Sequence, residues 1–238
     1  MLGVARRLIP LVAGAVVVVA GFAAPSAFAG QTITGAVSDV ASDLTPSVPG
    51  GQCYPAANQN NCRRILVLKQ IGDWIYAGGI ISSVTDRTTG VTTSGFHNIF
   101  RFSATTHKVD TSWKPQFYQS AQANSTTAYN DSAITGIATD GAGTLYVAGS
   151  FSQYAPAPGA AGVGRRGVAA INATTKALLP FNAKVCTGGG ACVVNDVEYV
   201  DGTVWLGGHF SQIAGQAVNS LAFVDPITGA LTGTMRCP

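Results

Sequence analysis

Histidines and carboxylates are the residues of this chain best suited to catalysis or metal binding, and their spacing limits the chemistry. His97, His107 and His209 share no regular spacing and have no neighbouring Glu or Cys, which zinc-binding motifs require. We interpret them as surface or turn histidines and expect no bound metal. The chain also lacks a Gly-x-Ser-x-Gly elbow, a His-Glu-x-x-His motif and a phosphate-binding loop.

The carboxylates point to structure rather than to catalysis. Asp196 and Glu198 are two residues apart, so in a strand they share one face, whereas glycosidase carboxylates oppose each other across the substrate. Asp73, Asp140 and Asp201 recur in turns, where a short acceptor side chain stabilises the backbone. We therefore expect neither a catalytic residue nor a cofactor site among the residues of this chain.

Three residues remain as candidates for ligand binding. Trp113 is the best candidate for an exposed aromatic side chain that stacks on a sugar. Trp74 and Trp205 lie within repeated apolar segments and are expected in the core. Arg165 and Arg166 form a basic tip on a long loop, for which solvated surface is the simplest interpretation.

The five cysteines predict disulfides. Cys53 and Cys62 bracket a polar loop, and Cys186 and Cys192 bracket a Gly-rich one, so local pairing is the economical interpretation, although four cysteines permit three connectivities. A metal site is disfavoured because the spacing is wider than in zinc knuckles and no His is adjacent. Cys237 is left without an assigned partner.

The N-terminus predicts export. Arg6 and Arg7 precede an apolar run from 8 to 24, and Ala27-Phe28-Ala29 matches a signal-peptidase site. We expect residues 1–29 to be a cleaved signal peptide and the protein to be secreted into a disulfide-permissive compartment. An uncleaved membrane anchor is the alternative. No later segment is apolar enough to span a membrane.

Composition narrows the partners and the fold class. There are 14 basic and 11 acidic residues, so nothing favours nucleic acid or an anionic membrane surface as a partner. Charged residues make up only 11% of the chain, while small residues abound. This composition favours short strands and tight turns over long amphipathic helices.

One segment occurs three times along the chain. Residues 72–79 (GDWIYAGG) reappear as 143–150 (GTLYVAGS) and 202–209 (GTVWLGGH). Similar apolar runs flank each copy, and an Asp- or Asn-initiated turn follows. If the copies are repeated units, Tyr76, Tyr146 and Trp205 hold equivalent positions in the second strand, and Ile81, Phe151 and Phe210 are equivalent near its end. Strand alternation then places Tyr76 and Gly78 on one face, and Ile75 and Ala77 on the other.

Each copy predicts a four-stranded antiparallel sheet, the blade of a β-propeller. The fold class is therefore all-β, with three such repeats at about 65–115, 134–183 and 193–238 forming a partial propeller over 65–238. An irregular arm over 30–64 precedes it. A β-sandwich with accidental internal similarity is the alternative.

The repeated pattern also resembles a known family. Gly-Asp-x-apolar-Tyr-apolar-Gly-Gly-x-Phe-Ser, followed by a strand and Asp-x-x-Thr-Gly, is similar to the delta-60 repeats of secreted, actinobacterial-type β-propellers. These are distantly similar to Kelch and galactose-oxidase propellers. The resemblance covers the chain from about Ile65 and implies a fold but no shared catalytic set.

These observations predict a binding role. Propellers have about four to eight blades, so we expect the remaining blades to belong to a longer chain. Our leading hypothesis is a non-catalytic extracellular propeller that binds or scaffolds a cell-surface protein or polysaccharide. The alternative is the propeller domain of a secreted oxidoreductase or hydrolase acting on carbohydrate, with catalytic residues outside this chain.

Overall fold

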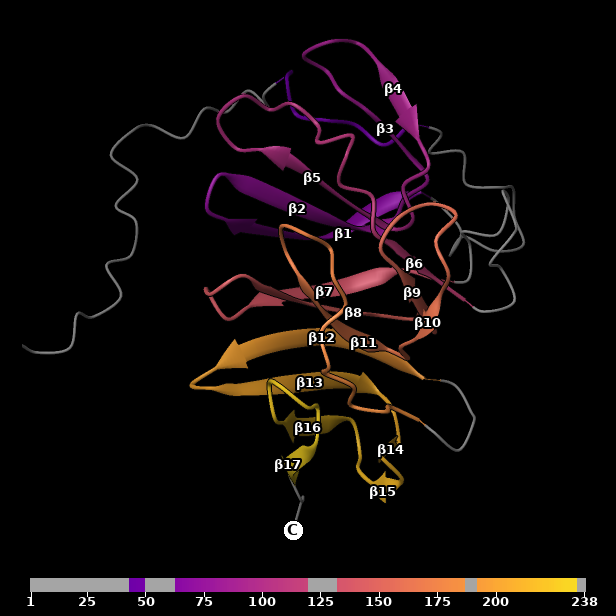
Figure 1. The fold of residues 1–238 in the computed structure, drawn as a ribbon, viewed down its shortest axis with the longest axis vertical. Coiled ribbons are helices and arrows are strands. Elements are labelled where there is room, and N and C mark those ends of the chain that lie inside the picture. Colours follow the sequence, from indigo (N-terminus) through magenta and orange to yellow (C-terminus); the bar gives the residue numbers. More distant parts are fainter. Residues whose placement is uncertain (1–42, 50–62, 120–131, 187–191, 235–238) are drawn as a thin grey trace, which may run out of the picture. The chain divides into compact units, whose positions relative to one another are not determined.

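A computed structural model describes residues 43–49, 63–119, 132–186 and 192–234, which form β-strands joined by turns (Figure 1). No helix in these ranges is long and apolar enough to cross a membrane. The predicted all-β class is confirmed. The predicted signal peptide, most of the N-terminal arm, Cys53, Cys62 and Cys237 lie outside the described residues.

Three antiparallel sheets share one strand order. In each sheet, the second strand along the chain lies between the first and the third. The first sheet contains β1 (Arg64–Ile71), β2 (Trp74–Ile80) and β5 (Ile99–Ser103). The second sheet contains β7 (Ile134–Thr139), β8 (Thr144–Gly149) and β11 (Val168–Asn172). The third sheet contains β12 (Val193–Val200), β13 (Thr203–His209), β16 (Leu221–Val224) and β17 (Leu231–Thr234).

A fourth strand is present in full only in the third sheet. There, β17 pairs with β16, and Leu231 lies opposite Val224. In the first two sheets the same place holds a single bridge, between Phe102 and Val109 and between Ile171 and Leu178. The segment after each third strand therefore turns back to meet it in all three sheets.

Short strands fill the connection between the second and third strand of each sheet. The first connection forms a hairpin of β3 (Ser83–Thr85) and β4 (Thr92–Ser94). The second contains β9 (Gln153–Ala155) and β10 (Val163–Gly164), and β9 also pairs with β6 (Gln116–Tyr118). The third is a hairpin of β14 (Gln212–Ile213) and β15 (Gln216–Ala217).

A bulge in each first strand explains one glycine in every copy. The register shifts after Ile65 in β1, Ile134 in β7 and Val194 in β12. The residues opposite are Gly79, Gly149 and Gly208, where a Cβ would overlap a backbone carbonyl oxygen of the first strand or of the residue before it. Glycine is therefore required at this place.

The bulges also correct the alignment of the copies. Overlaying the segments on their first glycine sets Gly149 against Gly78, but the pairing registers set it against Gly79. The overlay was one residue out because Gly143 directly precedes β8, whereas Asp73 separates Gly72 from β2. The corrected register places Tyr76, Tyr146 and Trp205 three residues before the required glycine.

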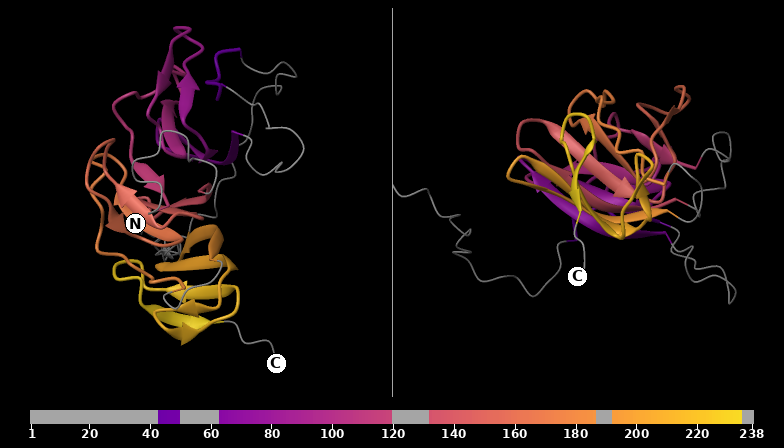
Figure 2. Two further views of the ribbon diagram at one scale, coloured as in Figure 1. Left: turned by 90° about the vertical axis from the view of Figure 1, so that its right-hand side faces the viewer. Right: turned by 90° about the horizontal axis from the view of Figure 1, so that it is seen from below.

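The sheets pack face to face, with β7 against β1 and β2, and β12 against β7 and β8 (Figures 1 and 2). Tyr76 and Val147 are buried in the cluster between the first and second sheets. Tyr146 and Val197 are buried in the cluster between the second and third. β8 is covered on both faces, which explains its nearly continuous apolar sequence.

Candidate functional site

Trp113 is not an exposed aromatic residue, and that prediction is wrong. Its side chain is only 1% exposed, and its indole Nε1 donates a hydrogen bond to the carbonyl oxygen of Ala173 at 2.8 Å. Its ring meets the Tyr76 ring edge to face, with centroids 5.2 Å apart. The polar residues around Trp113 suggested a surface loop, but this segment fills the space between the first and second sheets.

Arg165 and Arg166 are half-buried rather than extended into solvent. The Arg165 guanidinium donates to the carbonyl oxygens of Phe181 and Leu179 at 3.1 and 3.3 Å, and Arg166 Nη1 donates to Cys186 at 3.0 Å. Both line a cavity of about 400 Å³. These bonds anchor the long loop to the segment after the second sheet. A ligand at the two arginines stays a prediction.

The structure contains the predicted disulfide between Cys186 and Cys192, with Cα atoms 6.1 Å apart. This bond joins the segment after the second sheet to the start of β12. It therefore closes the connection between the second and third sheets.

The acidic pair of β12 is exposed, and each member has a contact that the structure describes. Asp196 Oδ1 accepts a bond from the neighbouring Val197 amide, while Glu198 forms a surface ion pair with Lys69 at 3.7 Å. Within the described ranges, no group of three or more His, Cys, Asp or Glu side chains is placed to hold a metal ion.

One histidine differs from expectation. His97 is half-buried, with its ring edge-on to that of Tyr118, and burial lowers its pKa to about 4. It is therefore neutral at physiological pH. The apolar strand β5 begins two residues after His97, and this nearby apolar sequence was the available sign of burial.

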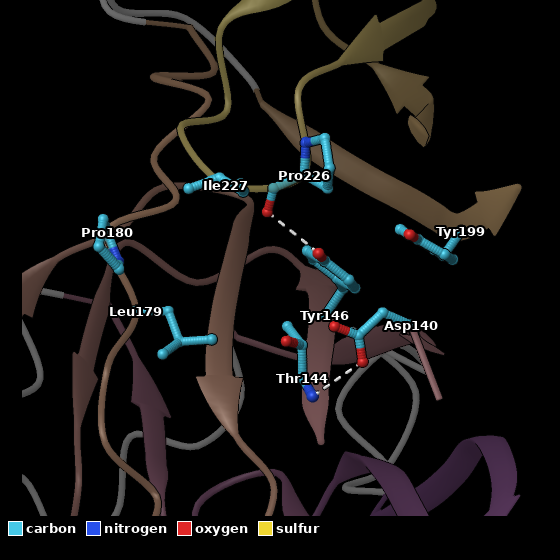
Figure 3. A pocket seen from close by; sticks show the side chains of 8 residues that line it. All are labelled: Asp140, Thr144, Tyr146, Leu179, Pro180, Tyr199, Pro226 and Ile227. Atoms are coloured by element: carbon cyan, nitrogen blue, oxygen red, sulfur yellow. Dashed lines mark hydrogen bonds between the residues drawn. The ribbon is translucent and has the colours of Figure 1, made fainter. Parts of the chain in front are cut away.

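The most distinctive feature is a cavity of about 390 Å³ between the second and third sheets, here called the inter-sheet pocket (Figure 3). Its walls come from the turn before β8, from β8 itself, from the segment after β11, from β12 and from the turn after β16. The lining residues are Asp140, Thr144, Tyr146, Leu179, Pro180, Tyr199, Pro226 and Ile227.

Two parallel tyrosine rings form the aromatic part of this pocket. The rings of Tyr146 and Tyr199 lie 6.0 Å apart with an interplanar angle of 9°. The Tyr146 hydroxyl donates a bond to the carbonyl oxygen of Pro226 at 3.0 Å. Burial, together with the carboxylate of Asp140, raises the Tyr146 pKa to about 12, so the hydroxyl stays protonated.

Asp140 supplies the negative charge of the pocket. Its Oδ1 accepts bonds from the amides of Ala142 and Thr144 at 2.8 and 3.0 Å, as Figure 3 shows for Thr144. Burial opposes ionisation, but the Thr144 side chain and these amides outweigh it and lower the Asp140 pKa. Ion pairs in the described part of the chain are Lys69–Glu198 and Arg101–Asp110, so Asp140 has no cationic partner there.

Sequence reasoning placed some of these residues but missed the pocket. Asp140 was expected in a turn and Tyr146 in a repeated strand, and both are there. The sequence pattern did not identify Tyr199 and Pro226 as site residues, because an aromatic residue at a strand end and a turn proline have many structural explanations. The missed signal was the repeat itself: residues that differ between copies mark where packing differs.

Comparisons with known proteins provide no relative from which a function can be transferred. No protein-family model matches the chain, and no curated protein matches it significantly. Among solved structures, the computationally designed protein Ika8 is similar over 71% of this chain, with 13% identity and a TM-score of 0.32. The chain spans 60% of the length of that protein, and a likeness this weak carries no argument.

Proposed function

We propose that this chain is a non-catalytic extracellular binding module built from β-propeller blades, and that it binds its ligand in the inter-sheet pocket. The observation that carries the proposal is the combination in one cavity of two parallel tyrosine rings and an ionised carboxylate. Aromatic walls with a few placed polar groups are typical of ligand sites, and the volume of about 390 Å³ falls within the usual range.

The blade interpretation rests on two faces at the ends of the stack. Tyr76 and Tyr146 are each 2% exposed because the next sheet covers them, whereas Trp205 at the same position is 38% exposed. On the opposite face, Ile137 is 3% exposed but its counterpart Leu68 is 59% exposed. Further sheets of the same design would cover both faces, as the blades of a delta-60-type propeller in a longer chain would.

Secretion is proposed together with the fold. The disulfide between Cys186 and Cys192 supports it, because such bonds persist mainly in oxidising compartments. The proposed ligands are therefore those of the cell exterior, a surface protein or a polysaccharide.

The test is binding of the secreted chain to cell envelopes of the producing organism. We expect saturable binding that a Tyr199→Ala variant loses by at least tenfold. Tyr199 is partly exposed, so the variant should fold normally, which circular dichroism would check. A Trp205→Ser variant serves as the control, because it alters an exposed aromatic residue outside the pocket. Absent binding, or binding that ignores Tyr199, would contradict the proposal.

A further inference from the structure

The place that the inter-sheet pocket occupies is filled by an arginine in the preceding pair of sheets. The Arg101 guanidinium carbon lies 4.3 Å from the centroid of the Trp74 ring and 5.2 Å from that of the Trp113 ring. The guanidinium donates to Asp110 Oδ2 at 2.7 and 2.9 Å and to the Ala173 carbonyl oxygen at 3.0 Å. One side chain thus joins two aromatic rings, a carboxylate and a carbonyl oxygen.

Strand registers identify the counterpart of Arg101 in the second sheet. Arg101 pairs with Tyr76 on β2, and Ala170 pairs in the same way with Tyr146 on β8. Leu179 occupies the place of Asp110, since each directly follows the residue that bridges back to the third strand. A large cationic side chain is thus replaced by a methyl group.

The aromatic contacts follow the same correspondence. Trp74 corresponds to Thr144, because each lies two residues before the tyrosine. Trp113 corresponds to Phe181, which meets Tyr146 edge to face at 5.4 Å. Three of the replacements, at Ala170, Leu179 and Thr144, shorten or remove a polar or bulky group. Thr144 and Leu179 both line the pocket, and Ala170 pairs with Tyr146, which also lines it.

The pocket keeps the groups that a guanidinium needs. The Pro226 carbonyl oxygen stands where Ala173 does in the first pair, and it can accept a second bond besides that from Tyr146. Tyr199 provides an aromatic face. Asp140 replaces Asp110 as the carboxylate, and its Oδ1 accepts bonds from the two turn amides.

We infer that the inter-sheet pocket binds a guanidinium group, presented by an arginine side chain of a partner protein. This inference rests on the proposed binding function and names its ligand class. A planar guanidinium can stack on an aromatic ring while its edge donates to a carboxylate and a carbonyl, as Arg101 does within this chain. Lysine offers a point charge without that planar fork, so it should bind more weakly.

The direct test is titration of the secreted chain with N-acetyl-arginine methylamide, followed by NMR of the tyrosine rings. The citrulline analogue is the matched control, because it has nearly the same shape without the charge. We expect saturable shifts in the millimolar range with arginine, and affinity at least tenfold weaker with citrulline. Glucose and cellobiose are titrated in parallel as uncharged polysaccharide probes.

Two variants locate the site. Asp140→Asn keeps the oxygen that accepts the turn amides but removes the charge, so arginine affinity should fall about tenfold. Asp43→Asn removes the same charge from an exposed site outside the pocket and should have no effect. The double variant Ala170→Arg with Leu179→Asp installs the arginine of the first sheet pair, so it should abolish binding of the added arginine analogue.

The outcomes separate this inference from the function on which it rests. Equal affinity for arginine and citrulline, or stronger binding of sugar, would overturn the arginine inference and leave a binding pocket of another specificity. If no probe binds but the envelope binding still requires Tyr199, the arginine inference is likewise overturned and a binding pocket of another specificity remains. Failure of the envelope binding itself would reject the proposed function. Arginine binding that is insensitive to Asp140→Asn would also count against the inference.

Discussion

Gly208 on β13 lies directly opposite Val194 at the bulge of β12, and a Cβ on Gly208 would come within 2.9 Å of the Val194 Cα. The neighbouring Gly207 has no heavy atom within 4 Å of its own Cβ position. Two adjacent glycines thus have opposite steric constraints. The first prediction compares them in one strand.

Gly208→Ala should lower the free energy of unfolding by about 3 kcal/mol or more, because backbone on both sides of the bulge must move. Gly207→Ala should change it by less than about 1 kcal/mol, since alanine costs no space there and restricts the unfolded chain. Urea denaturation of both variants measures the difference. Similar stability of the two variants would contradict this prediction, because it would show that the backbone at the bulge accommodates the added methyl group at little cost.

A second prediction concerns the ion pair between Arg101 and Asp110, whose side chains are 11% and 13% exposed. Arg101→Ala leaves a largely buried carboxylate without its partner and should cost about 3 kcal/mol. Adding Asp110→Leu removes that carboxylate and reproduces the pair of residues found in the second sheet. The double variant should therefore be at least about 1 kcal/mol more stable than the single one. Additive losses would contradict this.

A third prediction concerns the disulfide between Cys186 and Cys192, which are separated by six positions. Replacing both by serine should lower the free energy of unfolding by about 2 kcal/mol, because the unfolded chain is no longer constrained by a small loop. The measurement is urea denaturation with and without reductant. Reductant should destabilise the parent chain by more than the variant, which keeps only the predicted Cys53–Cys62 bond.

A fourth prediction is a pH dependence due to His97. Its folded-state pKa of about 4 lies below the ordinary value of 6.5. Between these two pH values the unfolded chain binds a proton that the folded chain does not. Stability should therefore fall as the pH decreases from 6.5 to 4. His97→Gln should flatten this slope, while His209→Gln, at an exposed site, should preserve it.

The sequence was sufficient to predict the strands and their antiparallel order, because both follow from local patterns. Tyr76 and Tyr146 recur with alternating apolar neighbours, and the turn residues between strands are polar or glycine. The pocket could not be predicted in this way. Its relation to the first pair of sheets appears only when the strand registers show that Ala170 stands where Arg101 does.

The burial of Trp113 could not be predicted from its local sequence either. A tryptophan among Thr, Ser, Lys and Pro has the local sequence of a surface loop, and no short-range pattern predicts its burial. Its hydrogen bond to Ala173 joins positions 60 residues apart. Contacts of that range depend on how the sheets stack, which no single segment specifies.

The two open faces of the stack are unlike, since one presents Leu68 and the other Trp205. Unlike faces join head to tail rather than about a two-fold axis, so association through them has no built-in end point. It closes into a ring only if the rotation between successive copies of the chain divides a full turn; otherwise it continues as a fibre. The way the Leu68 face of one copy seats on the Trp205 face of the next therefore decides whether copies of this chain, left alone with each other, would form a small closed particle or an open polymer.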